Sequence, residues 1–351
     1  MPEGTLAVPL TPLTSPAELR AAHPLQPDAS KLIAKAREEV IDILEGRNSR
    51  MLAIVGPCSL DDTRQKDWGY SAVAFAKKLK ALAKDPLLAE ELLVIMRCPP
   101  AKPRTDLGHR GLEQTSIETA REILAEIANL GMPLASEVMH ARHLAQYGDL
   151  LTVAWTGARN GDDTNLRHAL SASKLPVLCK NGSDGTLAMA VNAIRTIRAP
   201  HRNVELIMPD GRMGKLPQSE GNSNACGLIY RGGSNASSAK EYEAQIQEAA
   251  KAAQELGAGL IADTAHGGAI AHGGKSVDGQ INAHEHLVEL MKDGLPLKGI
   301  MVEAYLQSGS DPSGGTPGTS LTDPCVSFDT LIDMLYTTAE TKRNIAQQKG
   351  K

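Results

Sequence analysis

MLAIVGPCS, residues 51–59 of this 351-residue chain, has the pattern that predicts the fold. An uninterrupted apolar run bounded by Gly and Pro has the length and composition of a buried strand, and the polar residues behind it mark the end of that strand. The same unit recurs along the whole chain. The expected strands are residues 51–55, 92–97, 133–137, 150–154, 175–180, 226–231, 259–263 and 298–303.

Amphipathic patterns of helical length lie between most of these strands. The clearest are residues 115–131 and 237–257, and a last helix fits 328–346. Strands that are apolar throughout and alternate with helices form a parallel sheet that helices cover on both faces. Eight such strands in one chain predict an α/β fold of the (β/α)₈ barrel type. A doubly wound sheet is the structural alternative.

The segments outside the alternating strands and helices determine the expected domain organisation. Residues 1–29 are rich in Pro, Thr and Ser and are predicted to form an extended arm, followed by a helix at about 30–46. We therefore expect an N-terminal arm and helix at 1–46 and one barrel domain at 47–351. The Gly-rich polar stretches 209–225 and 308–324 are predicted long loops, and loops of that length are often functional.

Composition excludes several classes of protein. The net charge of −4 argues against a dedicated nucleic-acid binder, and no apolar stretch approaches the length of about 18 residues that a membrane span needs. The N-terminus lacks the basic and apolar regions of a signal peptide. The five cysteines are far apart and form no CxxC, which argues against a disulfide framework and favours the cytoplasm.

Cationic residues fall at or just after the ends of the expected strands. In a barrel all these ends open on one face, which carries the active site. Uncompensated like charges repel each other, so their convergence predicts an anionic ligand, namely one or two phosphorylated and possibly carboxylated small molecules. The six cations are Arg97, Lys102, Arg104, Arg159, Lys180 and Arg231.

A second group has the chemistry of metal ligands: Cys58, His266, Glu303 and Asp323. They follow the first, seventh and eighth strands, and the first and eighth are neighbours once a barrel closes. A thiolate, an imidazole and two carboxylates suit Mn²⁺, Fe²⁺, Co²⁺ or Zn²⁺. Taken singly, each residue also has an ordinary structural interpretation. Cys58 could be a small buried core residue, and His266 could be a hydrogen-bonded loop residue instead of a metal ligand.

Other possible motifs carry no function. The sequence HEH at 284–286 is predicted to be a solvated helix face, because residues i and i+2 of a helix do not face each other. The patterns GxGxxG, P-loop and GxSxG are absent, which argues against dinucleotide enzymes, P-loop kinases and α/β-hydrolases.

In combination, these motifs resemble the type I 3-deoxy-D-arabino-heptulosonate 7-phosphate (DAHP) synthases over roughly residues 30–345. The resemblance implies a barrel with an N-terminal extension, a divalent metal, and a homodimer or homotetramer. It implies the condensation of phosphoenolpyruvate with erythrose 4-phosphate, which opens the shikimate pathway. It rests on GPCS (56–59), MR (96–97), KPRT (102–105), SE (136–137), GAR (157–159), KNGSDGT (180–186), RGG (231–233), DTAH (263–266), MVE (301–303) and SLTDPC (320–325).

The resemblance also implies residue roles. Cys58, His266, Glu303 and Asp323 match the metal ligands of the family. Arg104 and Thr105 match the site for the aldehyde phosphate. Lys102, His266 and Glu137 are the catalytic candidates, with Glu137 positioning or deprotonating the attacking water. The phosphoenolpyruvate site corresponds to Arg97, Lys102, Ala158, Arg159, Lys180 and Arg231.

The chain departs from the family pattern around the aldehyde side. Pro99 and Ala101 stand where Tyr and Glu are usual, and Gly267 and Gly268 stand where Ala and Asn are usual. These departures leave two alternatives open: a synthase that takes a different aldehyde phosphate in a specialised pathway, and a silent regulatory homologue. Lys174 replaces a serine that lines the aromatic effector pocket in some members, so feedback inhibition by an aromatic amino acid is not expected.

Overall fold

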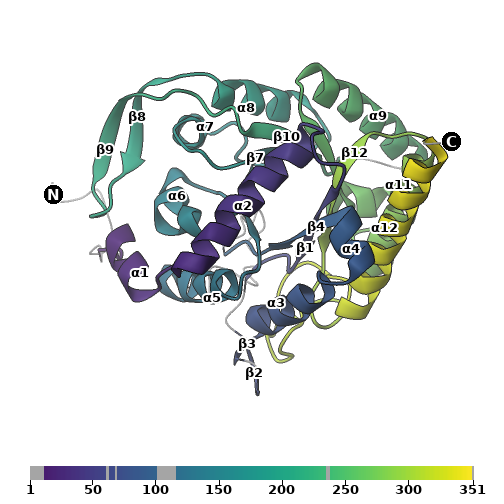
Figure 1. The fold of residues 1–351 in the computed structure, drawn as a ribbon, viewed down its shortest axis with the longest axis horizontal. Coiled ribbons are helices and arrows are strands. Elements are labelled where there is room, and N and C mark those ends of the chain that lie inside the picture. The colour runs from purple at the N-terminus through teal and green to yellow at the C-terminus, as the bar shows by residue number, and fades with distance from the viewer. Residues whose placement is uncertain (1–11, 61–62, 68, 101–115, 235–237, 350–351) are drawn as a thin grey trace.

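The structure, a computed structural model, describes residues 12–60, 63–67, 69–100, 116–234 and 238–349. Eight parallel strands close into a barrel in the order β1-β12-β11-β10-β7-β6-β5-β4 (Figure 1). The predicted (β/α)₈ barrel is confirmed, and the doubly wound alternative is wrong. The strands are β1 (Met51–Gly56), β4 (Leu92–Arg97), β5 (Leu134–Glu137), β6 (Val153–Thr156), β7 (Val177–Lys180), β10 (Ala225–Tyr230), β11 (Gly259–Asp263) and β12 (Leu297–Glu303).

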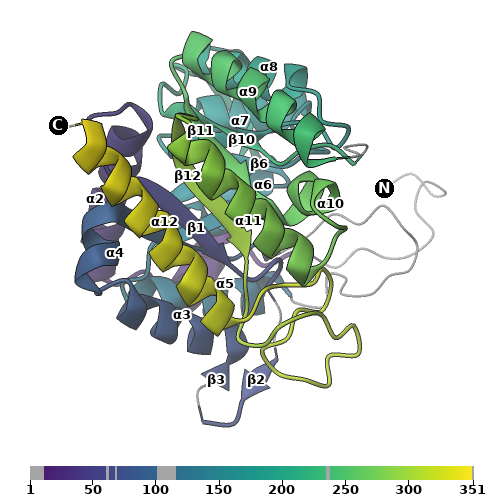
Figure 2. The ribbon, with the colours of Figure 1, turned by 90° about the vertical axis from the view of Figure 1, so that its right-hand side faces the viewer.

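Helices surround the barrel, and α11 and α12 run side by side on its outer face (Figure 2). The predicted helices at 115–131, 237–257 and 328–346 correspond to α5, α9 and α12. The helices that follow β1 are α3 (Ser71–Leu82), α4 (Pro86–Glu91), α5 (Ile117–Asn129), α6 (Ala141–Tyr147), α7 (Thr164–Ser171), α8 (Ala188–Arg198), α9 (Ala239–Glu255), α10 (Ala269–Ala271), α11 (Val277–Lys292) and α12 (Phe328–Lys349). A short hairpin, β2 (Arg64–Gln65) and β3 (Gly69–Tyr70), lies between β1 and α3.

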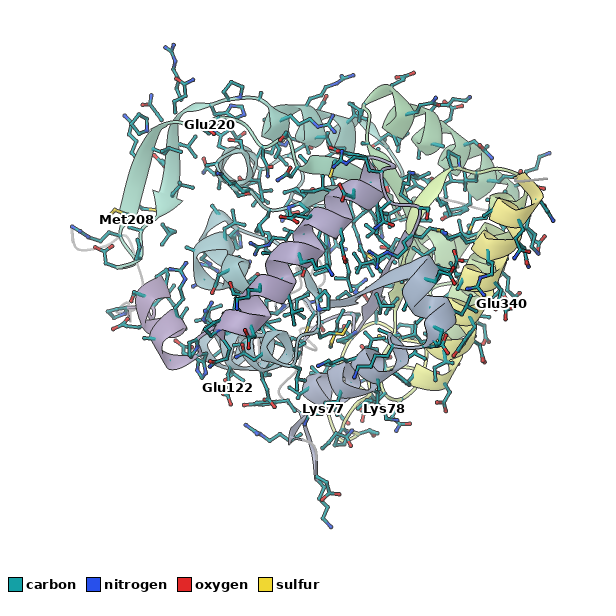
Figure 3. The ribbon with its side chains drawn as sticks, in the orientation of Figure 1. Lys77, Lys78, Glu122, Met208, Glu220 and Glu340 are labelled. Carbon is teal, nitrogen blue, oxygen red and sulfur yellow. The ribbon has the colours of Figure 1, made fainter. Side chains whose placement is uncertain are left out.

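The alternation of side chains along each strand produces two hydrophobic clusters. Leu52 and Ile54 of β1 point into the barrel, whereas Ala53 and Val55 pack against the surrounding helices. Both sets are fully buried, so the strands are apolar on both faces. Charged side chains such as Lys77 and Glu340 lie on the outer surface (Figure 3).

Helix α2 (Pro27–Leu44) closes the amino-terminal opening of the barrel. Its buried residues Val40, Ile43 and Leu44 belong to the same cluster as the inward-pointing strand residues (Figure 1). Because the described residues fill this end with apolar side chains, a polar ligand is expected at the opposite opening.

The N-terminal region is more helical than predicted. Helix α1 (Pro16–Ala22) lies within the expected extended arm, and α2 begins at Pro27, before the expected start. Ser15 caps α1 through a reciprocal capping box with Glu18. The motif S-x-x-E with Pro at the first helical position was therefore available in the sequence as a helix start signal. The division into 1–46 and 47–351 stays a prediction.

The stretch 209–225 is only partly the loop that was expected. It contains the turn and second strand of a hairpin, β8 (Arg202–Ile207) and β9 (Met213–Gln218), which projects from the barrel beside α6 and α7 (Figure 1). The missed signal is Pro209-Asp210-Gly211, a common turn tripeptide between two alternating stretches. Residues 304–327 do form a long loop, with isolated bridges alone.

The largest difference in a strand boundary concerns the fourth barrel strand; the other boundaries agree with the prediction to within two residues. The fourth barrel strand was expected at 150–154, but Leu150 ends the 3₁₀ turn η1 (Gly148–Leu150) and β6 begins at Val153. A short apolar run does not by itself separate a strand from the turn that leads into it. Within the described residues, no helix combines the length and apolar character that a membrane span requires.

Candidate active site at the carboxyl-terminal opening

The predicted site residues that the structure describes gather at one opening of the barrel. Since all eight strands are parallel, their carboxyl ends meet there. Arg97, Glu137, Lys180 and Glu303 are the last residues of β4, β5, β7 and β12, and Arg231 directly follows β10. The other opening is filled by α2, so among the described residues this opening is the one that offers polar side chains to a ligand.

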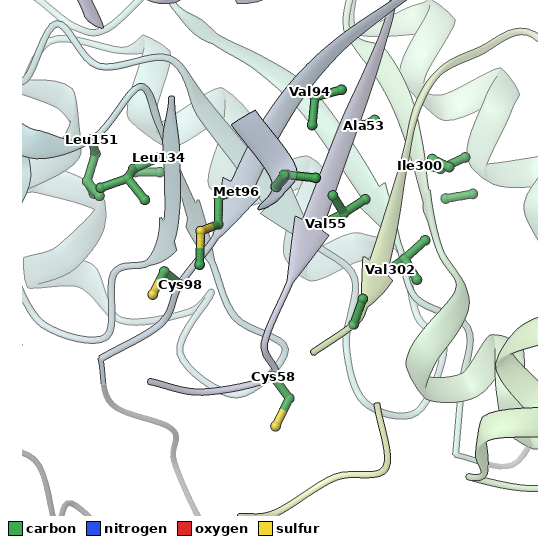
Figure 4. Close-up of a cluster of buried hydrophobic side chains, with 14 of the residues drawn as sticks. Ala53, Val55, Cys58, Val94, Met96, Cys98, Leu134, Leu151, Ile300 and Val302 are labelled. Atoms are coloured by element: carbon green, nitrogen blue, oxygen red, sulfur yellow. The ribbon is translucent and has the colours of Figure 1, made fainter. Parts of the chain in front are cut away.

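Three of the four predicted metal ligands lie together. The Sγ atom of Cys58 and carboxylate oxygens of Glu303 and Asp323 all lie within 4.8 Å of one another, and the three residues are buried. Cys58 lies beyond the end of β1, close to the end of β12 (Figure 4). Its sulfur is 3.0 Å from the hydroxyl of Ser320 and 2.8 Å from that of Thr322.

His266 lies beside this group. It sits in the turn η2 (Thr264–Gly268), and its Nε2 is 3.8 Å from Glu303 Oε1. Its Nδ1 is 3.0 Å from Asp263 Oδ2, a contact that fixes the tautomer and leaves Nε2 available as a ligand. Burial lowers the pKa of His266 to about 4, so the imidazole is neutral near pH 7.

The residues present therefore fit a divalent transition ion. A buried group of one thiol and two carboxylates, with a neutral imidazole next to it, combines donors of the kinds that such ions prefer. Lys275 from the loop before α11 places its Nζ 2.6 Å from Asp323 Oδ1 and compensates part of the negative charge. The neutral imidazole needs no deprotonation before it binds a metal.

Arg97 is almost fully buried and links the metal-ligand group to the rest of the opening. Its Nη2 donates to Glu303 Oε1 at 2.9 Å, and Nη2 and Nε approach the backbone oxygens of Cys58 and Pro57. Burial opposes its charge, but Glu303 and Asp263 raise the pKa of Arg97. Its buried Nη1 has no hydrogen-bond partner among the described residues, so it can donate to a ligand.

Lys180 forms a second buried ion pair in the opening. Its Nζ is 2.7 Å from Asp263 Oδ2, and both residues are almost or completely buried. Burial lowers the pKa of Lys180, whereas Asp263 opposes this effect. Trp155 lies beneath both buried cations, with its ring centre 5.6 Å from the Arg97 guanidinium carbon and 5.8 Å from Lys180 Nζ.

Arg231 is mostly buried at the end of β10. Its Nη1 donates long hydrogen bonds, each of 3.4 Å, to the carbonyl oxygens of Ser183 and Gly232. Burial lowers the pKa of Arg231, and Asp263 opposes this. Asn181, which is fully buried, accepts from the Arg231 backbone N–H at 2.7 Å and so ties β7 to β10.

Glu137, Ala158 and Arg159 occupy neighbouring strand ends. Arg159 is exposed, and Ala158 and Glu137 are half-buried. A Cβ at Gly157 would lie 1.9 Å from Glu137 Oε1. Only glycine therefore allows the Glu137 carboxylate to rest against the backbone that leads to Ala158.

Lys102, Arg104 and Thr105 lie outside the described residues, as does Ala101, so their predicted roles stay predictions. The expectation that the cations are uncompensated is wrong for Arg97 and Lys180, because each is paired with a buried carboxylate. A buried charge without a partner costs several kcal/mol, on the order of 3–5, which explains the pairing. The carboxylates come from other strands, so the spacing in the sequence does not reveal the pairs.

The prediction for the HEH segment is wrong in part. His284 is 2% exposed and its Nε2 is 2.8 Å from the hydroxyl of Thr338 on α12. It belongs to the buried stripe of α11, in which Gln280, Leu287 and Met291 follow helical spacing. His286 makes a different contact, 2.7 Å from His272, so the two histidines do not act as one pair.

Three further residues of the opening are not among the predicted site residues. Asp263 and Asn181 stand inside the motifs DTAH and KNGSDGT, but no role was assigned to either. The sequence signal for both is a charged or amide residue at the end of an apolar strand. Such a residue is buried and needs hydrogen-bond partners, which indicates a place in the site. For Trp155, one of the 2 tryptophans, the only sequence signal for a place in the site was its position beside the fourth strand.

The fold and this opening are typical of a barrel enzyme: the opening combines buried cations with a group of residues that could hold a divalent ion. Comparison with known proteins narrows the class further. The family model described as "DAHP synthetase I family" matches residues 24–335. The chain belongs to this family.

Individual relatives agree with this assignment. The chain is 32% identical over 337 residues to the phospho-2-dehydro-3-deoxyheptonate aldolase, Tyr-sensitive, of Escherichia coli, covering 90% of this chain and 89% of that protein. It is 32% identical over 356 residues to the phospho-2-dehydro-3-deoxyheptonate aldolase of Corynebacterium glutamicum, covering 94% and 92%. The solved structure of the Francisella tularensis phospho-2-dehydro-3-deoxyheptonate aldolase matches with a TM-score of 0.83 and 26% identity, covering 95% of this chain and 98% of that one.

Proposed function

We propose that this enzyme condenses phosphoenolpyruvate with erythrose 4-phosphate and water to give DAHP and phosphate, the first step of the shikimate pathway. The observation that carries the proposal is the arrangement of Arg97, which donates to Glu303 in the metal-ligand group and keeps Nη1 available for a ligand. An anionic substrate held by Arg97 therefore lies next to that group. The family of the chain supports the same reaction.

The phosphoenolpyruvate site consists of the buried cations. Arg97, Lys180 and Arg231 bind its carboxylate and phosphate, with Arg159 and the backbone N–H of Ala158 completing the phosphate contacts. Asp263 and Glu303 reduce the repulsion between the cations before the substrate arrives. Lys102 belongs to the same proposed site, and Arg104 and Thr105 bind the phosphate of the aldehyde.

The proposed metal ligands are Cys58, His266, Glu303 and Asp323. The ion is Mn²⁺, Fe²⁺, Co²⁺ or Zn²⁺, all of which accept mixed sulfur, nitrogen and oxygen ligands. When bound, it supplies Lewis-acid polarisation of the aldehyde oxygen. Asp263 holds His266 through Nδ1, and Lys275 limits the charge on Asp323.

The remaining steps belong to the side chains of the opening. C3 of phosphoenolpyruvate forms the new carbon–carbon bond to the aldehyde carbon, whose C=O becomes a hydroxyl by taking up a proton. Water attacks C2 and releases a proton, so the protons balance. Glu137 positions this water or takes its proton. Phosphate then leaves with cleavage of its C–O bond, while Arg159 and Arg231 stabilise the developing negative charge.

The test uses protein stripped with a chelator and reloaded with Mn²⁺. Loss of phosphoenolpyruvate absorbance is followed with and without erythrose 4-phosphate, and the heptulosonate product is measured. We expect consumption that needs both the metal and the aldehyde, with one product formed per phosphoenolpyruvate consumed. Absence of turnover while phosphoenolpyruvate still binds would contradict erythrose 4-phosphate as the acceptor.

A different aldehyde phosphate is the second candidate. Gly267 packs against the backbone of Gly232, where a Cβ at 267 would come within 2.4 Å of the carbonyl carbon. The family usually has Ala and Asn after the histidine, so the surroundings of the aldehyde side differ in this chain. A screen of aldose phosphates under the same conditions separates the two acceptors, and failure with every aldehyde would indicate a silent homologue.

The proposal includes the setting of the enzyme. It acts on small molecules in the cytoplasm as a homodimer or homotetramer, without nucleic acid or membrane. All five cysteines are buried and none is paired in a disulfide, which fits a reducing compartment. Light scattering of the purified protein measures the oligomeric state.

A further inference from the structure

Gln280 is a buried polar residue of α11 that lies away from the strand ends. Its exposed fraction is 1%, and it lies in the first turn of the helix, on the side that faces the barrel. A buried amide costs free energy unless its oxygen and nitrogen both find partners. The contacts of Gln280 therefore indicate what the residue does.

The side-chain amide forms a reciprocal pair with the backbone of Glu303. The Glu303 N–H donates to Gln280 Oε1 at 3.1 Å, and Gln280 Nε2 donates to the Glu303 carbonyl oxygen at 3.3 Å. The pairing of β11 with β12 ends at Asp263 and Met301, two residues before Glu303. The amide of Gln280 thus takes the place that a peptide group of β11 would occupy if the strand continued.

The same amide reaches the other segments that carry proposed metal ligands. Its Nε2 donates to the Pro324 carbonyl oxygen at 3.0 Å, and Pro324 directly follows Asp323. Its Oε1 lies 3.4 Å from the hydroxyl of Thr264, two residues before His266. That hydroxyl is also 3.2 Å from the Met301 carbonyl, so its single proton is shared between two acceptors.

We infer that Gln280 is a positioning residue for the metal centre, because one buried amide contacts the Glu303 backbone, the carbonyl of Pro324 after Asp323, and the hydroxyl of Thr264 near His266. The inference rests on the proposed metal-dependent function. No other neutral side chain of this length offers one acceptor and two donors at these atoms. A reversed amide would face the Glu303 N–H with its own N–H₂ group and two carbonyls with its oxygen, so the partners fix its orientation.

The role follows from the distances that a metal site tolerates. Ligand atoms must meet within a few tenths of an ångström, and outer contacts hold the ligands in that geometry. Glu303 ends a strand, Asp323 lies within a long loop and His266 lies in a short turn, so no single element holds all three. Gln280 supplies a shared anchor and touches neither substrate nor metal.

The experiment measures Co²⁺ binding by Gln280→Glu and Gln280→Met. The first keeps the shape but sets a carboxylate oxygen against two carbonyls, and the second keeps the length but has no hydrogen bonds to offer. Chelator-stripped protein is titrated with Co²⁺, following the charge-transfer absorption between the Cys58 thiolate and cobalt. We expect the Co²⁺ affinity of both variants to fall by about 10- to 100-fold, as is typical when an outer partner of a ligand is lost.

The matched control is Thr338→Val, which removes a buried hydrogen bond to His284 of the same helix. We expect it to lower the melting temperature of the metal-free protein without changing the Co²⁺ affinity, which separates a general loss of packing from a loss of positioning. A Co²⁺ affinity of Gln280→Met equal to that of the wild type would overturn the inference. If Gln280→Glu does not fold, the Gln280→Met measurement alone tests the inference. If wild-type protein binds Co²⁺ through Cys58 but consumes no phosphoenolpyruvate, the proposed function fails while the variant affinities still test the inference.

Discussion

The two openings of the barrel are built by the same eight strands and have opposite characters. At the amino-terminal opening, Val40, Ile43 and Leu44 of α2 fill the interior with apolar side chains. At the carboxyl-terminal opening, buried ion pairs replace them, with Lys180 against Asp263 and Arg97 against Glu303.

This difference separates stability from chemistry within one fold. Apolar burial at the closed end contributes free energy of folding and can be repacked with modest cost. Buried charges at the open end contribute little net stability, because desolvation offsets their attraction, and their proposed role is to bind an anionic substrate. Substitutions at the two ends should therefore change different measurements.

The largest expected effect comes from Lys180→Met at the open end. The substitution removes a proposed substrate contact and leaves Asp263 buried without its cation. We expect kcat/KM to fall by about 100- to 1000-fold, as when one donor to developing charge is removed. The unfolding free energy should fall by about 3–5 kcal/mol. Steady-state kinetics and urea unfolding measure the two effects.

The control for this variant is Lys298→Met near the closed end of β12. Lys298 has no ion-pair partner among the residues that the structure describes, and the Met side chain keeps most of its apolar stem. Its unfolding free energy should stay within about 0.5 kcal/mol of the wild type. Equal losses of activity in the two variants would remove the distinction between the openings.

Ile43→Ala is the corresponding substitution at the closed end. Ile43 is fully buried among the inward-pointing strand residues, so its truncation leaves a cavity. We expect a loss of about 2–5 kcal/mol in the unfolding free energy, with kcat and KM unchanged at a temperature where the variant is folded. Leu32→Ala on the same helix is the control, because Leu32 is 52% exposed. A kinetic defect in Ile43→Ala would show that the ends are coupled.

Gly157→Ala should impair the open end with a smaller effect. The added Cβ would collide with Glu137 Oε1 and displace the carboxylate from its position. We expect kcat to fall by roughly 100-fold, the low end of the contribution of a general base, and Glu137→Gln should show a similar loss. Gly148→Ala is the matched control, since its Cβ would meet neighbours only at 3.8 Å. Full activity of Gly157→Ala would argue against a role for Glu137.

The smallest expected effect on stability concerns His284 on α11, a helix outside the barrel and away from both openings. Burial lowers the pKa of His284 to about 4, whereas an unfolded histidine titrates near pH 6.5. The unfolded state therefore binds more protons between these values, and the stability present above pH 6.5 is lost as the pH falls towards 4. From pH 7 to pH 5, His284 should account for a loss of about 2 kcal/mol.

Urea unfolding of wild type and His284→Gln at pH 7 and pH 5 measures this contribution. The variant lacks the titration of residue 284, so its stability should fall less on acidification. Other buried histidines such as His143, whose pKa burial lowers to about 3, titrate in both proteins and cancel in the comparison. An equal fall in the two proteins would mean that His284 does not titrate in this range.

Local pattern explains which predictions succeeded. Apolar strand runs and amphipathic helices were found because burial on both faces leaves a continuous mark on the sequence. Pro209-Asp210-Gly211 and Ser15 with Glu18 were equally local signals that were not used, and α1 and the hairpin were missed for that reason. His284 was misassigned because only α12 decides which face of α11 is buried.

The sequence by itself determined the barrel and the set of polar residues at the strand ends, since parallel strands bring their carboxyl ends to one face. Only the tertiary structure decided how those residues pair. Lys180 meets Asp263, Arg97 meets Glu303, and Gln280 reaches Glu303 from a helix. These partners are far apart in the chain, and a buried polar group selects its partner by distance in the closed barrel, where no periodicity of the sequence records the choice.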